Sequence, residues 1–267
     1  MTTTPLERRE RFRAMHQSGV FVLPNPYDIG TARLLAAQGF EALATTSAGF
    51  AATLGRLDMQ ITRDEVVGHT RVMAAATDLP LNVDAERCYA DDLVGVQQTV
   101  QLLADAGAAG FSIEDWNPDT DQIDPIDTAA ERVAAAAETA RQHGLLLTAR
   151  CENHLHGIAD VDDTIERLQA YRKAGAHALY APLLPDIASI ERVVAIGLPV
   201  NVLLLPGGPT VAELGAVGVR RISTGSLLAR VAMGAFADAG QSLLDTGQLP
   251  ANVSLLSYKL AAKAFQK

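Results

Sequence analysis

The sequence is poor in cysteine and has no long run of apolar residues. Cys88 and Cys151 are its only cysteines. Two are too few for a disulfide framework, so we expect a reduced, cytoplasmic protein. Residues 1–13 are polar and charged, unlike a signal peptide. No stretch approaches the roughly 20 apolar residues of a membrane-spanning helix, and we expect no membrane partner.

Positive charge is also scarce. The chain has 22 lysines and arginines against 31 acidic residues, a net charge of -9. Nucleic acids and anionic membranes need basic surfaces, so this balance argues against both as partners. A small anion responds to local charge only. With 267 residues, 48% of them hydrophobic, the chain is long enough for one large core, and we expect a single domain over 1–267.

A pattern of helix, glycine and short apolar strand repeats along the chain. Glycine just past a helix can adopt the left-handed conformation that closes its last turn. Continuous apolar runs are typical of parallel strands buried on both faces. About eight such strands alternating with helices predict an α/β fold, a (β/α)₈ TIM barrel. The expected strands cover 20–23, 42–47, 79–86, 110–115, 145–150, 178–180, 200–202 and 221–223. A Rossmann-like open sheet is the alternative, but no G-x-G-x-x-G follows the first strand.

The segment 252–267 predicts an extra C-terminal helix, because Leu255, Leu256, Leu260 and Ala264 share one side of it. We expect this helix to cover the barrel or to dock on a neighbouring subunit.

Charged residues follow the predicted strands at their carboxyl ends, where barrel enzymes hold their active sites. Asp84 and Glu86 end the strand 79–86, and Glu114 ends the strand 110–115. Converging carboxylates repel one another unless a cation neutralises them. Oxygen ligands favour Mg²⁺, or Mn²⁺, over Zn²⁺. The alternative is that these acids cap helices or pair with basic residues at the rim.

Arg150 ends the strand 145–150, where its guanidinium can clamp a carboxylate or a phosphoryl group. Its alternative role is to neutralise Glu114 or Glu152. The small-residue turn 46–49 offers backbone amides to a carboxylate, and Asp58 lies in the following loop.

Other residues are weaker candidates. His154 and His156 follow the fifth strand and are possible general acids, although loop histidines are common. Cys88 is either a reactive thiol or a small buried residue. Glycine-rich turns at 205–209 and 223–226 raise the alternative of a phosphate-binding isomerase or aldolase barrel. No lysine ends a strand, which argues against a Schiff-base aldolase.

The order and spacing of several short motifs resemble the isocitrate lyase/phosphoenolpyruvate mutase superfamily over nearly the whole chain. The motifs are Asn25-Pro26-Tyr27-Asp28, Thr46-Ser47-Ala48-Gly49, Leu54-Gly55-x-x-Asp58, Asp84-Ala85-Glu86, Ser112-Ile113-Glu114-Asp115, Ala149-Arg150 and Arg221-Ile222-Ser223-Thr224-Gly225. The resemblance implies a barrel whose last helix is often exchanged between subunits, and hence a homodimer or homotetramer.

The same resemblance implies a site and a chemistry. It implies Mg²⁺ held by Asp84, Glu86 and Glu114, largely through water. The substrate would be a small 2-oxo or 2-hydroxy carboxylate reacting through a metal-stabilised enolate. The residues implied to bind it are Thr46, Ser47, Ala48, Arg150 and Asn201, with Asp58 close to metal and substrate.

The chain also departs from that family. Family lyases carry a Lys-x-Cys-Gly-His segment in a mobile loop after the fourth strand, whereas residues 116–125 here are short and acidic and lack Lys, Cys and His. Arg87 and Cys88 replace the usual small residues after the acidic pair. These differences argue against isocitrate or methylisocitrate cleavage, and almost as much against phosphonate chemistry.

We therefore expect a Mg²⁺-dependent carbon–carbon lyase for a small 2-oxo or hydroxy dicarboxylate. Decarboxylation of an oxaloacetate-like acid fits the altered loop best. C–C cleavage with His154 or Tyr27 as general acid is the close variant. The alternatives are a C–P hydrolase or mutase of phosphonopyruvate-like compounds and a non-catalytic 2-oxo acid binder.

Overall fold

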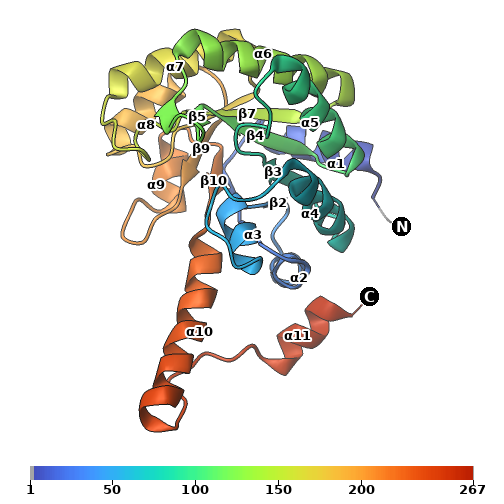
Figure 1. The fold of residues 1–267 in the computed structure, drawn as a ribbon, viewed down its shortest axis with the longest axis vertical. Helices are drawn as coiled ribbons and strands as arrows, with labels where there is room; N and C mark the ends of the chain where they lie inside the picture. The colour runs from blue at the N-terminus through green and yellow to red at the C-terminus, as the bar shows by residue number, and fades with distance from the viewer. Residues whose placement is uncertain (1–2, 267) are drawn as a thin grey trace.

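A parallel eight-stranded sheet curls into a nearly closed barrel in the computed structural model, which describes residues 3–266 (Figure 1). The strand order is β1 (Phe21–Leu23), β10 (Arg221–Ser223), β9 (Val200–Leu203), β8 (Ala178–Tyr180), β7 (Leu146–Arg150), β4 (Gly110–Glu114), β3 (Leu81–Asp84) and β2 (Leu43–Ala44). The Ala44 amide donates to the Pro24 carbonyl at 3.0 Å and bridges the two edge strands. The predicted (β/α)₈ barrel is confirmed.

Helices surround the barrel because their apolar faces must be buried against the outer side of the sheet. They are α2 (Ile29–Gln38), α3 (Ser47–Thr53), α4 (Arg63–Ala76), α5 (Leu93–Asp105), α6 (Ile126–His143), α7 (Val161–Lys173), α8 (Ile187–Val194) and α9 (Val211–Ala216). As the sequence pattern predicts, glycine ends several of them in the left-handed region. Gly39, with φ of 103°, closes α2 in this way.

Helix α1 (Pro5–Met15) closes the amino-terminal end of the barrel. The fully buried Phe12 packs beside Ala109, Leu146 and Ala178, which lie at or just before the starts of their strands. Arg9 donates to the Ala108 carbonyl at 3.0 Å and so ties α1 to the barrel. Because this end is plugged, a ligand has access from the carboxyl ends of the strands.

The acidic segment after β4 forms a short antiparallel hairpin, β5 (Trp116–Asn117) and β6 (Gln122–Ile123). Asp124 fixes the hairpin to the barrel, since its carboxylate pairs with Arg87 at 2.9 Å. Its carbonyl also accepts from Arg167 at 2.7 Å. Both carboxylate and guanidinium are largely buried. The segment 116–125 is therefore an ordered part of the barrel rim.

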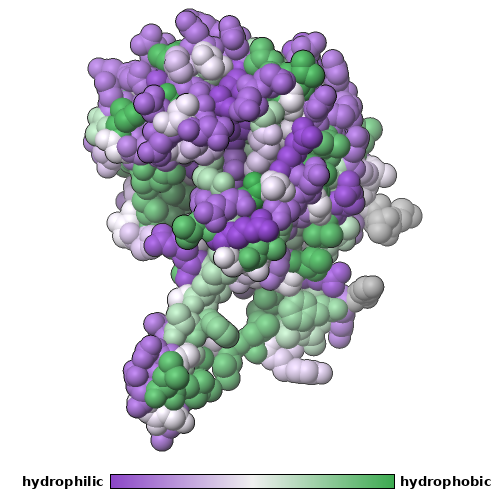
Figure 2. Space-filling view, in the orientation of Figure 1, coloured by the Kyte–Doolittle hydropathy of each residue, from purple (hydrophilic) through white to green (hydrophobic). Residues whose placement is uncertain are grey.

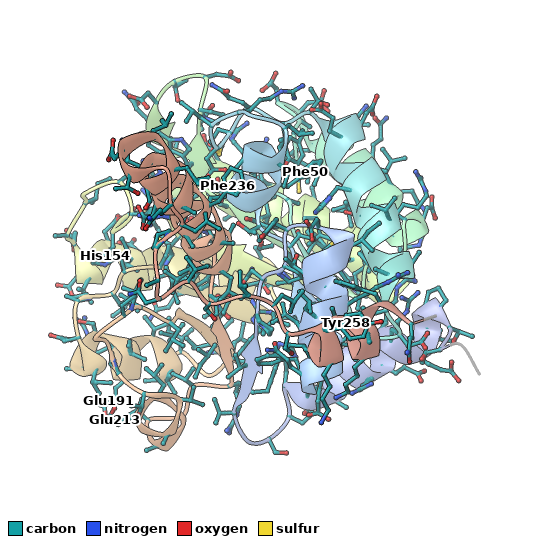
Figure 3. All side chains as sticks on the ribbon, turned by 90° about the horizontal axis from the view of Figure 1, so that it is seen from below. Phe50, His154, Glu191, Glu213, Phe236 and Tyr258 are labelled. Atoms are coloured by element: carbon teal, nitrogen blue, oxygen red, sulfur yellow. The ribbon has the colours of Figure 1, made fainter. Side chains whose placement is uncertain are left out.

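The C-terminal elements leave the barrel. Helix α10 (Leu227–Thr246) projects away from it, and α11 (Tyr258–Phe265) returns to pack on α2 (Figure 1). The C-terminal arm, formed by α10, α11 and the segment between them, is rich in apolar side chains (Figure 2). Phe236 on α10 is 82% exposed (Figure 3). The expected C-terminal helix is thus α11, which packs on the barrel of its own chain. Most of α10, by contrast, is not covered by other parts of the chain. Within residues 3–266, no helix combines the length and the apolar character needed to cross a membrane.

Candidate active site

A cavity of about 220 Å³ opens among the carboxyl ends of the strands. This is the position expected for the site of a barrel enzyme. Side chains that face the barrel interior line it, because alternate residues of a strand point to the same side. The predicted site residues that line it are Thr46, Ser47, Ala48, Asp58, Asp84, Arg150 and Asn201.

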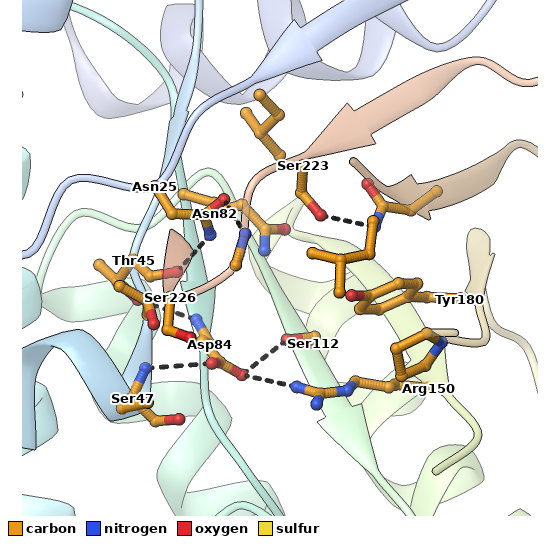
Figure 4. Close-up of a pocket in the computed structure, with 18 of the residues that line it drawn as sticks. Asn25, Thr45, Ser47, Asn82, Asp84, Ser112, Arg150, Tyr180, Ser223 and Ser226 are labelled. Carbon is orange, nitrogen blue, oxygen red and sulfur yellow. Dashed lines mark hydrogen bonds and ion pairs between the residues drawn. The ribbon is translucent and has the colours of Figure 1, made fainter. Parts of the chain in front are cut away.

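Asp84, the last residue of β3, is the best-connected acid in the cavity (Figure 4). Its carboxylate accepts from the Ser47 amide at 3.1 Å and lies 3.5 Å from the Arg150 guanidinium. Its own amide donates to Thr45 at 2.9 Å. These contacts hold the carboxylate between β2, β3 and β7.

Arg150 is surrounded by acids. Its guanidinium lies 3.1 Å from Glu114 and also pairs with Glu152 through two hydrogen bonds. Burial by itself would lower the pKa of Arg150, but the carboxylates of Glu152, Glu114 and Asp84 have a larger effect in the opposite direction. The pKa of Arg150 is therefore raised well above its usual value, and the side chain stays charged. Burial raises the pKa of Glu114, against the lowering effect of Arg150. Of the two roles that the sequence leaves open for Arg150, the structure shows its pairing with the acids, and its role as an anion clamp stays a prediction.

Glu86 is buried in a strained turn. Glu86, Cys88 and Tyr89 have positive φ angles of 45°, 62° and 51°, which cost energy in residues other than glycine. The Glu86 Oε1 atom is buried without a hydrogen-bond partner among residues 3–266. Burial, and then the charges of Asp84 and Asp58, raise the pKa of Glu86 to about 8. Such a carboxyl group lacks a compensating cation.

The small-residue turn is the first turn of α3. Thr46 caps this helix by accepting from the Gly49 amide at 3.2 Å. The Ser47 amide is already bonded to Asp84, whereas the Ala48 amide has no partner within residues 3–266. The Ser47 hydroxyl donates to Asp58 at 2.9 Å. Burial, and next the charge of Asp84, raise the pKa of Asp58.

Other sequence candidates lie outside the cavity lining. The His154 ring contacts Thr164 at 3.3 Å and lies toward the side of the barrel (Figure 3). Tyr27 is half-buried beside α3. Cys88 is fully buried, and burial raises the pKa of its thiol to about 12, as expected for a structural cysteine. Neither His154 nor Tyr27 is brought to the cavity in this structure.

The remaining weaker candidates divide between rim and cavity. His156 stacks on Trp116 of the hairpin, with ring centroids 3.4 Å apart. Of the two glycine-rich turns, 223–226 contributes to the cavity lining and 205–209 does not.

Several cavity residues were not predicted. They are Asn25, Thr45, Asn82, Ser112, Tyr180 and Arg221. Asn25 accepts from the Thr224 and Gly225 amides, both at 2.9 Å, and joins the ends of β1 and β10. Inward alternation could have indicated two of the others, since Asn82 precedes Asp84 by two residues and Ser112 precedes Glu114 by two.

The site has more acids than bases. Within residues 3–266, Arg150 is the only basic side chain paired with Asp84 or Glu114. No group of three Asp, Glu, His or Cys side chains in that range surrounds a common point closely enough to hold a metal directly. The orphaned Glu86 oxygen and the all-oxygen donor set nevertheless fit a hard divalent cation. The ligand set Asp84, Glu86 and Glu114 stays a prediction.

Known proteins resemble this chain along most of its length. A 2-methylisocitrate lyase 2 of Corynebacterium glutamicum, named as probable, is 30% identical over 91% of this chain and 83% of its own. An oxaloacetate decarboxylase of Rhodopseudomonas palustris (strain BisB18) is 32% identical over 76% of this chain and 72% of its own. A solved structure from Burkholderia cenocepacia J2315, described as "a putative lyase/mutase", is 47% identical, with a TM-score of 0.89 over 94% of each chain.

A phosphonopyruvate hydrolase solved with oxalate and Mg²⁺ is 22% identical, with a TM-score of 0.81 over 99% of this chain and 95% of its own. At that identity the likeness concerns the fold. The phosphoenolpyruvate phosphomutase family model matches residues 12–244. The chain therefore belongs to the phosphoenolpyruvate phosphomutase family, in agreement with the resemblance of its motifs.

Proposed function

We propose that the protein is a Mg²⁺-dependent carbon–carbon lyase for a small 2-oxo or 2-hydroxy dicarboxylate, with decarboxylation of an oxaloacetate-like acid as its reaction. The observation that carries the proposal is the placement of Asp84 and Arg150 in one small cavity, 3.5 Å apart. A carboxylate–cation platform and an anion clamp are the two elements that such a substrate needs.

Asp84, Glu86 and Glu114 would hold the cation largely through water, since no three such side chains within residues 3–266 surround a common point closely enough for direct ligation. Bound Mg²⁺ would supply Lewis-acid stabilisation of the negative charge that develops on the substrate oxygen. Charge balance supports this assignment. Glu86 is buried without a cationic partner among residues 3–266, and its pKa is raised to about 8. A divalent cation would also compete with Arg150 for Asp84 and Glu114, and so leave guanidinium donors for the substrate.

The protein groups bind and orient the substrate carboxylates. Arg150 keeps its charge because Glu152 and Glu114 outweigh the effect of burial. The Ala48 amide, free within residues 3–266, offers a further donor at the start of α3. Asn201 is held in place by Arg221 at 2.9 Å and by Ser223 at 2.9 Å, so its position in the wall is fixed. Fixed donors favour a bound geometry close to the reacting one.

A panel of 2-oxo and 2-hydroxy dicarboxylates, followed by NMR with Mg²⁺, tests the proposal. We expect pyruvate from oxaloacetate, activity lost with EDTA and regained with Mg²⁺, and a tenfold or greater loss in Asp84→Ala. The exposed Asp127→Ala on α6 is the matched control. Phosphate release from phosphonopyruvate would refute the lyase. Thermal stabilisation by oxalate without any turnover would instead indicate a binding protein.

The phosphonate alternative has less support. It relies on Asn117, the asparagine of the hairpin. The Asn117 side chain lies 3.5 Å from Asp124 and does not line the cavity.

We also propose a homodimer or homotetramer built through α10. Its Phe236 and Leu244 side chains are 82% and 84% exposed, and contiguous apolar surface of this kind is typical of subunit interfaces. We retain the cytoplasm as the location, because both cysteines are free and buried.

A further inference from the structure

The proposed reaction needs a proton donor, and the sequence does not supply one in the usual loop. When the bond to the departing carboxylate breaks, the electron pair stays on the substrate and a carbon atom must be protonated. The hairpin segment 116–125 contains no Lys, Cys or His. Tyr27 and His154 do not line the cavity. The cavity wall is therefore the place where a donor from the protein would lie.

Tyr180 lies in that wall. It is the last residue of β8 and is paired in register with Arg150 of β7. Residues in register on adjacent strands face the same side of the sheet, so both side chains enter the barrel. The Arg150 guanidinium carbon lies 5.4 Å from the centre of the Tyr180 ring. Figure 4 shows the two side chains together, with the tyrosine hydroxyl toward the cavity.

Arg221 brings a second guanidinium to the cavity wall. Arg221, at the start of β10, is 3% exposed and lines the same cavity. It donates to Asn201 and to Thr148, both at 2.9 Å. No carboxylate within residues 3–266 pairs with it. Burial lowers the pKa of Arg221 to about 10, while Tyr180 acts in the opposite direction.

A buried charge without a counter-charge is costly. Arg221 is such a charge, and it shares the cavity wall with the phenol of Tyr180, which can become an anion. Burial raises the pKa of Tyr180 to about 12, so the hydroxyl carries its proton at neutral pH. Arg150 acts against that increase in the pKa, whereas the carboxylates of Glu152 and Asp84 add to it. A tyrosinate formed at this position would lie beside Arg150 and would share the cavity wall with Arg221, which has no carboxylate partner within residues 3–266.

We propose that Tyr180 is the catalytic proton donor, with Arg150 and Arg221 stabilising its tyrosinate form. The phenolic O–H bond breaks, a C–H bond forms at the carbon next to the substrate carbonyl, and the enolate supplies the electron pair. The tyrosinate recovers its proton from water before the next turnover. The proposal rests on the enolate chemistry of the proposed function, and does not depend on which bond is cleaved.

The experiment uses Tyr180→Phe, which keeps the ring and removes only the hydroxyl. The readout is exchange of the pyruvate methyl hydrogens with D₂O, followed by NMR in the presence of Mg²⁺. This exchange requires proton transfer but no bond cleavage. We expect it to fall about 100-fold or more, the usual effect of losing a general acid–base group. Oxalate affinity, measured by calorimetry, should stay within about threefold, because the hydroxyl is not needed for binding. Tyr27→Phe and His154→Gln are the matched controls and should exchange at the wild-type rate.

Exchange at the wild-type rate in Tyr180→Phe would overturn the proposal. Absence of exchange in the wild-type protein, or an equal loss in Tyr27→Phe or His154→Gln, would overturn it as well. A weaker oxalate affinity that accounts for the whole loss would indicate a structural role. If exchange behaves as expected but no dicarboxylate is cleaved, Tyr180 is the donor and the proposed lyase reaction is the part that fails.

Discussion

Replacing Glu86 by glutamine should change how the stability of the metal-free protein depends on pH. Burial and two neighbouring acids raise the pKa of Glu86 from 4.5 to about 8. An acid whose pKa is raised in the folded state holds a proton there that the unfolded chain has already lost. Its contribution is therefore favourable below about pH 4.5, and stability is lost as the pH rises toward 8.

The size of the effect follows from the same values. Each pH unit between 4.5 and about 8 is worth ~1.4 kcal/mol, so ionised Glu86 costs the folded state up to about 5 kcal/mol. Glutamine has nearly the same shape and cannot ionise. We expect the loss of stability between pH 5 and pH 8.5 to be smaller in Glu86→Gln than in the wild type by most of that amount.

Urea unfolding with EDTA at the two pH values measures this difference. The exposed Glu131→Gln on α6 is the control and should follow the wild type. Adding Mg²⁺ at pH 8.5 should stabilise the wild type, because a bound cation neutralises the carboxylate, and should stabilise Glu86→Gln much less. If Glu86→Gln and the wild type lose the same stability over this range, Glu86 carries no uncompensated charge and the argument for a cation there is refuted.

Three further changes test other parts of the molecule. Arg87→Ala should destabilise the fold by about 3 kcal/mol or more, since it leaves the buried Asp124 carboxylate without its ion-pair partner. Asp124→Ala should cost less, because Arg87 keeps the exposed Asp91 at 3.8 Å. The double variant should lose much less than the combined effects, and additivity in urea unfolding would show that the pair is not coupled. Phe12→Ala should lower the free energy of unfolding by about 3–5 kcal/mol by opening a cavity under the barrel, and a loss below 1 kcal/mol would contradict its role as a plug. Phe236→Asp on α10 should reduce the assembly mass in light scattering, whereas Val94→Asp, 61% exposed on α5, should not; an unchanged mass for both would refute the α10 interface.

The sequence predicted the barrel because its signals were local and repeated. A glycine after each of several helices and an apolar strand directly behind it are features of short segments, and eight such units leave few architectures. The strand-end positions of Asp84 and Arg150 followed from the same register. The functional significance of Tyr180 did not follow, because its importance depends on two arginines from β7 and β10 that only the closed barrel brings near it.

The arm and the hairpin were harder to predict for different reasons. The pattern over 252–267 indicated a helix, but it could not show that α10 would extend away from the barrel while α11 returned to α2. The segment 116–125 looked only like a loop without chemistry. Its order comes from Asp124, whose partners lie 37 residues before it and 43 residues after it, a distance at which sequence pattern gives no signal.

The pairing of Arg87 with Asp124 also constrains how the chain can evolve. Asp124 alone would be a buried carboxylate without its ion-pair partner, and Arg87 alone would keep only the exposed Asp91 at 3.8 Å. An intermediate that carries only one of them is therefore less stable. The two positions should therefore change together among relatives, with arginine at the first accompanied by aspartate at the second. Relatives that have a small residue at the position of Arg87, directly after Asp84 and Glu86, should lack an acidic residue at the position of Asp124. This covariation would separate an ordered-hairpin lineage from the rest of the family by sequence alone.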